Sequence, residues 1–184
     1  DVGFEDFHGT LFLVLKDDGD SSTPTYLDEA TGQPVSLTTT LRAVAIVPEG
    51  GNVIAGITPF TEMAVQLAER ASGKSLDPTQ FDATNPDSLP KDSELNALSS
   101  TYKVVSDIVG VDIGRTKPSI VNDPGFEQAA SASQTYGLKL AAIAKLTEDD
   151  DLTDGSNDAD VQKGIEAIIG TTAAPKIVKP NDDG

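Results

Sequence analysis

Residues 57–64 are Ile57-Thr58-Pro59-Phe60-Thr61-Glu62-Met63-Ala64, and the chain changes character at this stretch. Before it, apolar residues occur in short runs that glycine, proline and aspartate interrupt. After it, apolar residues recur at the spacing of helices. The sequence therefore predicts an α+β protein: a small antiparallel sheet or incomplete immunoglobulin-like sandwich over residues 1–58, followed by a bundle of about four α-helices over residues 59–170. Residues 171–184 are expected to form an extended tail or linker.

The N-terminal part has the pattern of several short strands joined by turns. The expected strands are residues 11–15, 25–27, 35–38, 41–47 and 53–57. The run Leu11–Leu15 is apolar throughout, which favours a central, buried strand. An immunoglobulin-like sandwich needs about seven strands in about 100 residues, so this part is short of strands. We therefore expect an unpaired sheet edge that could accept a strand from another chain.

The C-terminal part carries clear signals for helix starts and stops. Thr58 can cap the first helix, Pro59 fits its first turn, and Gly73 can end it. A second helix is expected over residues 92–109, with Asp92 as its cap and Gly110 as its stop. A third is expected to begin at Asp123-Pro124, and a short fourth is expected over residues 159–169.

The charge of the chain restricts its partners. It has 184 residues, of which 30 are acidic and 13 basic, so the net charge is −17. Such a surface repels nucleic acid and anionic membranes, while it attracts divalent cations. No apolar stretch reaches the roughly 18 residues of a membrane span. We therefore expect neither nucleic-acid binding nor membrane insertion. The absence of cysteine excludes disulfides and thiolate metal sites.

One acidic loop, residues 148–158, raises the question of calcium. An EF-hand loop fails here, because Leu152 and Val161 would occupy ligand positions that require oxygen donors. An irregular Ca²⁺ site stays open, with the alternative that the loop is a solvated linker whose last aspartate caps the next helix. Apart from this possible Ca²⁺, we expect no cofactor. The candidate ligands are Asp149, Asp151, Asp154 and Asp158.

Catalytic patterns are missing from the sequence. His8 is the single histidine, and no nucleophile motif accompanies it. Residues 68–75 fit a loose phosphate-loop pattern, but a helix precedes them where a strand is required. We interpret Gly73 as a helix stop instead, and we do not expect an enzyme.

The motifs together resemble a module that recurs in large secreted and surface, adhesin-like proteins of Proteobacteria, which often carry immunoglobulin-like β repeats. The similar segments are residues 26–32, 41–44, 57–64, 116–124 and 136–143. The resemblance covers most of residues 9–146 and transfers no functional residues. It implies an extracellular, cell-surface location and an architectural or adhesive role.

The expected function is a self-assembling structural module, such as a subunit of an extracellular filament. Its partners would be copies of itself or neighbouring surface-protein domains. The candidate donated strands are the N-terminal arm with Val2, Phe4 and Phe7, or the tail around Ile177-Val178. The alternative is a ligand- or glycan-binding module of a secreted protein. Glycan sites usually offer exposed aromatic rings, and this chain has three Tyr, six Phe and no Trp.

Overall fold

The computed structural model confirms a mixed α+β protein and describes residues 8–16, 26–27, 32–35, 39–51, 53–82, 84–147, 164–165 and 168. The strands are β1 (Gly9–Leu15), β2 (Tyr26–Leu27), β3 (Pro34–Val35) and β4 (Leu41–Val47). The helices are α1 (Pro59–Ser72), α2 (Asp92–Val109) and α3 (Ser131–Thr147). Short 3-10 turns occur at Pro78–Gln80, Pro86–Ser88 and Phe126–Gln128. The finer predictions, a sandwich and a bundle of about four helices, stay predictions.

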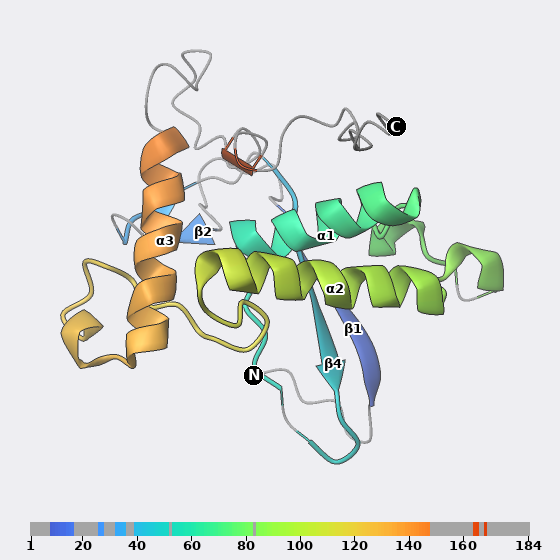
Figure 1. Ribbon diagram of the computed structural model, residues 1–184, viewed down its shortest axis with the longest axis horizontal. Helices are drawn as coiled ribbons and strands as arrows, with labels where there is room; N and C mark the ends of the chain where they lie inside the picture. The colour runs from blue at the N-terminus through green and yellow to red at the C-terminus, as the bar shows by residue number, and fades with distance from the viewer. Residues whose placement is uncertain are drawn as a thin grey trace, which may run out of the picture.

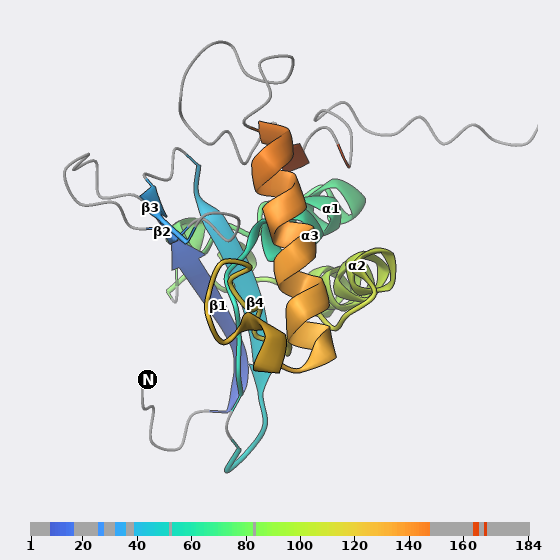
Figure 2. The same ribbon diagram turned by 90° about the vertical axis from the view of Figure 1, so that its left-hand side faces the viewer.

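The described strands form two separate antiparallel pairs, β1 with β4 and β2 with β3. In the longer pair, Gly9 lies opposite Val47 and Leu15 lies opposite Leu41. Helices α1 and α2 form an antiparallel hairpin that covers one side of this β1–β4 ribbon, and α3 crosses the end of the hairpin (Figures 1 and 2). The result is a two-layer arrangement of sheet and helices.

The start of α1 is as the sequence predicts. The Thr58 side chain accepts from the Thr61 N–H, the Thr61 side chain accepts from the Thr58 N–H, and Pro59 occupies the first turn. Gly73 ends the helix in the left-handed conformation, with φ 68°. The Tyr136 hydroxyl of α3 lies 2.7 Å from the Thr58 hydroxyl, so the cap also anchors α3.

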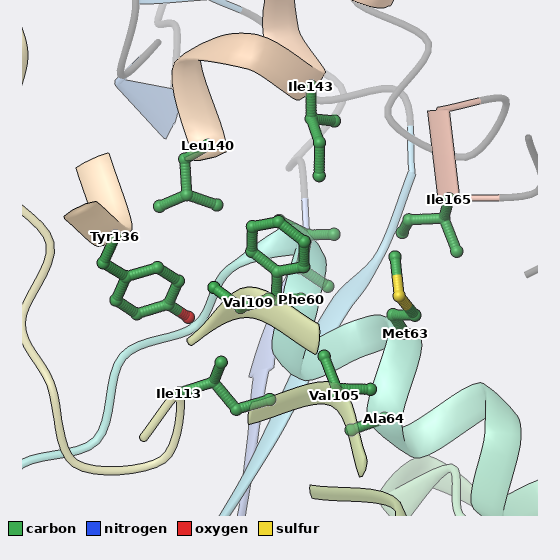
Figure 3. Packing of buried hydrophobic residues seen from close by; sticks show 11 residues of the cluster. Phe60, Met63, Ala64, Val105, Val109, Ile113, Tyr136, Leu140, Ile143 and Ile165 are labelled. Atoms are coloured by element: carbon green, nitrogen blue, oxygen red, sulfur yellow. The ribbon is translucent and has the colours of Figure 1, made fainter. Parts of the chain in front are cut away.

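The main core lies where the three helices meet the end of the ribbon (Figure 3). Leu41 of β4 packs there with residues of all three helices, so the two predicted parts of the chain share one core. A second cluster joins α1 and α2 to the middle of the ribbon, where Phe12 and Val44 pack against Val65, Ala68, Leu76 and Leu98. Ile165, beyond α3, is buried in the main core, whereas the rest of the expected fourth helix lies largely outside the described residues.

Two strand predictions are wrong. Residues 53–57 form no strand with β4, because side chains from the helices take the hydrogen-bonding groups at its edge, as described below. The run Leu11–Leu15 is a strand, but it is not central within the described residues. It pairs only with β4, and its side chains are half-buried, with Val14 37% exposed.

Two helix starts also differ from the predictions. Asp92 is the first helical residue of α2, not the cap, because the Glu94 carboxylate reaches back to accept from the Lys91 N–H. Helix α3 begins at Ser131 instead of Asp123-Pro124. The Asp123 carboxylate accepts from the Gly125 N–H at 2.7 Å, which closes a local turn and diverts the chain into a 3-10 turn.

Gly137 of α3 is the position where this fold most needs a glycine. A Cβ there would collide with the backbone carbonyl oxygen of Ser119. The Ser119 N–H donates to the Ser133 carbonyl at 3.1 Å, so the segment before α3 lies directly against the helix. The absence of a side chain at Gly137 thus allows this segment to approach the helix backbone closely.

Candidate functional site: the two edges of the sheet

The outer edge of β4, the edge away from β1, is closed by side chains of the helices. The Arg42 N–H donates to the Glu62 carboxylate at 2.8 Å, and the Val44 N–H donates to the Tyr102 hydroxyl oxygen at 2.7 Å. Helices α1 and α2 therefore place oxygen atoms where a neighbouring strand would place its carbonyl groups. At Arg42 and Val44 this arrangement satisfies the outward backbone donors and occupies the positions that an added strand would need.

A buried ion network holds the first of these side chains in place. The Arg42 guanidinium contacts the Glu62 carboxylate at 2.7 and 3.0 Å and the Glu69 carboxylate at 2.7 and 3.0 Å. Its side chain is 13% exposed, and that of Glu62 is 3% exposed. Burial alone would lower the pKa of Arg42, but the hydrogen bonds and charges of the two glutamates raise it above its ordinary value. The network fixes α1 to β4.

The same network extends to the segment that follows α1. The Glu69 carboxylate also accepts from the Leu76 N–H at 2.7 Å, and the Gln66 amide donates to the Glu62 carboxylate at 3.0 Å. Each glutamate thus has several donors, which is the condition under which a buried carboxylate is tolerated. The arrangement is a structural clamp and offers no uncommitted acid or base for catalysis.

Tyr102 occupies the second donor position on the outer edge of β4, the N–H of Val44. Burial raises the pKa of Tyr102 to about 12, against the opposing effect of the hydrogen bond from the Val44 N–H. Its phenol is therefore protonated throughout the neutral range. Gly114 lies against the ring, since a Cβ at this position would be 3.3 Å from a ring carbon. The turn at residues 112–115 thus supports the tyrosine from behind.

The outer edge of β1 contrasts with that of β4. Because Arg42 and Val44 direct their N–H groups away from β1, their opposite neighbours Val14 and Phe12, together with Thr10, must direct theirs away from β4. No strand in the described part of the chain pairs with this edge. The strand sequence GTLFLVL has no charged residue and no proline, so it lacks the features that usually guard an edge.

A groove runs beside β4 under α2. It has a volume of about 790 Å³. Apolar side chains line it from both elements, including Val44 and Ile46 of β4 and Leu95 and Leu98 of α2. Polar residues also line it, among them Lys103, Asp107, Asp112 and Arg115. Its volume is large enough to admit a small ligand.

The candidate calcium ligands Asp149, Asp151, Asp154 and Asp158 lie outside the described residues, as do the candidate donor segments at both termini. Within the described ranges, no three His, Cys, Asp or Glu side chains gather where they could hold a metal ion. His8 is exposed beside the start of β1. Among the described helices, none has the length and apolar character needed to cross a membrane.

Sequence reasoning missed the roles of Arg42, Glu62 and Tyr102. A signal was present for the two charged residues, because Arg42 interrupts an apolar strand and Glu62 lies in the first turn of a helix that the core covers. Such charges need partners, and each is the partner of the other. For Tyr102, no pattern in the sequence indicated that its hydroxyl would bind a strand.

No protein-family model, curated protein or solved structure matches the chain. The resemblance to the module of surface proteins therefore stays a prediction that depends on the quoted motifs alone.

Proposed function

We propose that the protein is an extracellular structural or adhesive module that assembles by accepting a strand at the outer edge of β1. In this proposal the sandwich that the sequence leaves incomplete is completed by another chain. The acceptor edge presents the N–H and C=O groups of Thr10, Phe12 and Val14. An added strand would gain ladder hydrogen bonds and contacts with half-buried apolar side chains.

The contrast between the two edges carries the proposal. The edge of β4 is occupied at Arg42 and Val44 by side chains from α1 and α2. The edge of β1 has no such cover within the described residues, and its sequence contains the strand-forming residues threonine, phenylalanine and valine. A two-stranded ribbon is marginal alone, so a further strand would add stability as well as connect subunits.

The donor is the N-terminal arm or the C-terminal tail of a neighbouring copy. The arm offers Val2, Phe4 and Phe7, and the tail offers Ile177 and Val178. The net charge of −17 disfavours non-specific association of copies, so assembly requires a specific, directional contact of this kind.

Sedimentation velocity of the full chain over a range of concentrations tests the acceptor. Val14→Pro removes one outward-facing N–H and places a proline ring on the edge, while the hydrogen bonds between β1 and β4 involve the alternate residues. Val14→Thr keeps the N–H and the branched shape, so it is the matched control. We expect the wild type and Val14→Thr to assemble and Val14→Pro to stay monomeric.

Two donor variants of the full chain complete the experiment. Phe4→Asp with Phe7→Asp disrupts the arm, and Ile177→Asp with Val178→Asp disrupts the tail. One of the two is expected to prevent assembly. If both assemble like the wild type, strand donation through the termini is wrong. If Val14→Pro assembles as well, the acceptor edge is wrong.

A second candidate function is ligand binding, which the groove beneath α2 favours. Its volume of about 790 Å³ lies in the range of small-molecule sites, and its lining is mixed apolar and polar. Glycan binding has less support, because Tyr102 is the single aromatic residue among the lining residues of this groove.

A further inference from the structure

The Tyr102 hydroxyl uses its oxygen as an acceptor, but its O–H donor is unused among the described residues. Its oxygen accepts from the Val44 N–H at 2.7 Å, but its own proton has no acceptor among the described residues. Tyr102 is also part of the lining of the groove. Tyr102 is partly buried and lines the groove, so its proton is available to donate to an oxygen of a ligand that enters there.

The charges around the groove cancel. Lys103 pairs with Asp107 at 2.8 Å, which commits both side chains. Asp112 accepts from the Gly114 N–H at 3.0 Å, and the Arg115 side chain forms no ion pair with any described residue. Two cations and two anions therefore line the groove, in a chain with a net charge of −17. This balance offers no net electrostatic attraction to an anion or to a cation.

The apolar lining of the groove determines the chemical character of the rest of the ligand. Val44, Leu95 and Leu98 present apolar surface on either side of Tyr102. A ligand that fills this part of the groove removes apolar area from water, and the phenol O–H fixes its orientation.

We propose that this groove binds a small, uncharged, mainly apolar molecule that carries one carbonyl oxygen, and that this oxygen accepts a hydrogen bond from Tyr102. The inference deepens the second candidate function, ligand binding. It does not depend on strand addition, because Tyr102 and the apolar residues that would hold the ligand belong to α2 and β4; of the acceptor edge of β1, Thr10 alone also lines the groove.

The experiment uses three probes of similar size and different head groups: 4-phenylbutan-2-one, propylbenzene and 3-phenylpropanoate. Each is titrated into the full chain and followed through the backbone amide resonances in NMR spectra. We expect the ketone to bind most tightly, with shifts concentrated at residues 44–46, 95–107 and 110–115. The carboxylate is expected to bind more weakly than the uncharged hydrocarbon.

Tyr102→Phe removes the donor and leaves the apolar lining. We expect it to weaken ketone binding about tenfold, the value of one ordinary hydrogen bond, and to leave propylbenzene binding unchanged. Val104→Ala is the control, since Val104 lies on the same helix but outside the lining of the groove, and it should leave both affinities unchanged.

Three results would overturn the inference. The ketone could fail to bind, whatever occupies the groove instead. It could bind no more tightly than propylbenzene. Tyr102→Phe could weaken both probes equally. If Tyr102→Phe does not fold, nuclear Overhauser contacts between the ketone methyl group and the Tyr102 ring in the wild type decide instead, and their absence would overturn the assignment. Loss of ketone binding together with intact assembly would leave strand addition untouched.

Discussion

The backbone N–H of Val44 donates a 2.7 Å hydrogen bond to the hydroxyl of Tyr102, a residue 58 positions further along the chain. This contact places a helix side chain where a β-strand would otherwise pair. Together with Glu62 at Arg42, it occupies the outward N–H groups of β4 that a further strand would need.

Tyr102→Phe should destabilise the fold. The substitution keeps the ring and removes the acceptor of the Val44 N–H, which leaves a backbone donor without its partner. We expect the free energy of unfolding to fall by about 2 kcal/mol, measured by urea denaturation. Val104→Ala, at a half-exposed position of the same helix, should change it by about 0.5 kcal/mol or less. Equal effects of the two variants would mean that the contact does not stabilise the sheet.

Alkaline pH should destabilise the protein through the same tyrosine. The pKa of Tyr102 is about 12 in the folded protein, above its ordinary value of 10.0. The unfolded chain therefore loses this proton first, so the stabilisation is fully present below pH 10 and is lost as the pH rises toward 12. The measurement is the difference between wild type and Tyr102→Phe in unfolding free energy at several pH values. A difference that stays constant through this window would contradict the assignment.

Arg42→Met should be among the more damaging single changes at a charged residue. It leaves the carboxylates of Glu62 and Glu69 together, largely buried and without their cation. We expect a loss of about 3 kcal/mol in unfolding free energy. Arg42→Lys should recover little of it, because an ammonium group cannot bind two carboxylates in a bidentate manner.

Lys103→Met provides the control for Arg42. It breaks an exposed ion pair with Asp107, whose contribution should be about 0.5 kcal/mol. A similar loss for the two variants would show that the buried clamp contributes no more than a surface pair.

Gly137→Ala should destabilise the protein although alanine is the better helix former. Helix propensity alone would favour the variant by about 1 kcal/mol. The added methyl group would collide with the Ser119 carbonyl, so we expect a net loss of about 2 kcal/mol in chemical denaturation. Ala132→Gly, at an exposed position of α3, should lose about 1 kcal/mol from propensity alone. An increase in stability for Gly137→Ala would contradict the close approach of the two segments.

Local patterns predicted those elements whose ends are set by nearby residues. Thr58, Pro59 and Gly73 define α1 as expected, since a cap, a first-turn proline and a stop act within a few residues. The predicted start of α3 was wrong. The Asp123 side chain, which could have capped a helix, instead closes a turn by accepting from the Gly125 N–H. The prediction of a strand at residues 53–57 was wrong for a different reason. Its place on β4 is taken by Glu62 and Tyr102, and contacts over such separations leave no mark in local periodicity.

The candidate site was predictable only in outline. An unpaired edge was expected from the shortage of strands, but the sequence did not indicate which strand would carry it. That choice depends on the hydroxyl of Tyr102 and the carboxylate of Glu62, whose positions follow from the packing of α1 and α2 on β4. The groove depends on the same packing, so composition and spacing could not reveal it.

Amide hydrogen exchange at β1, resolved residue by residue, tests the central claim most directly. In dilute, monomeric protein the N–H groups of Leu11, Leu13 and Leu15 should be protected by β4, while those of Thr10, Phe12 and Val14 should exchange rapidly. On assembly at higher concentration, the second set should become protected as well. Protection of Thr10, Phe12 and Val14 in the monomer, or continued rapid exchange in the assembled form, would contradict strand addition at β1.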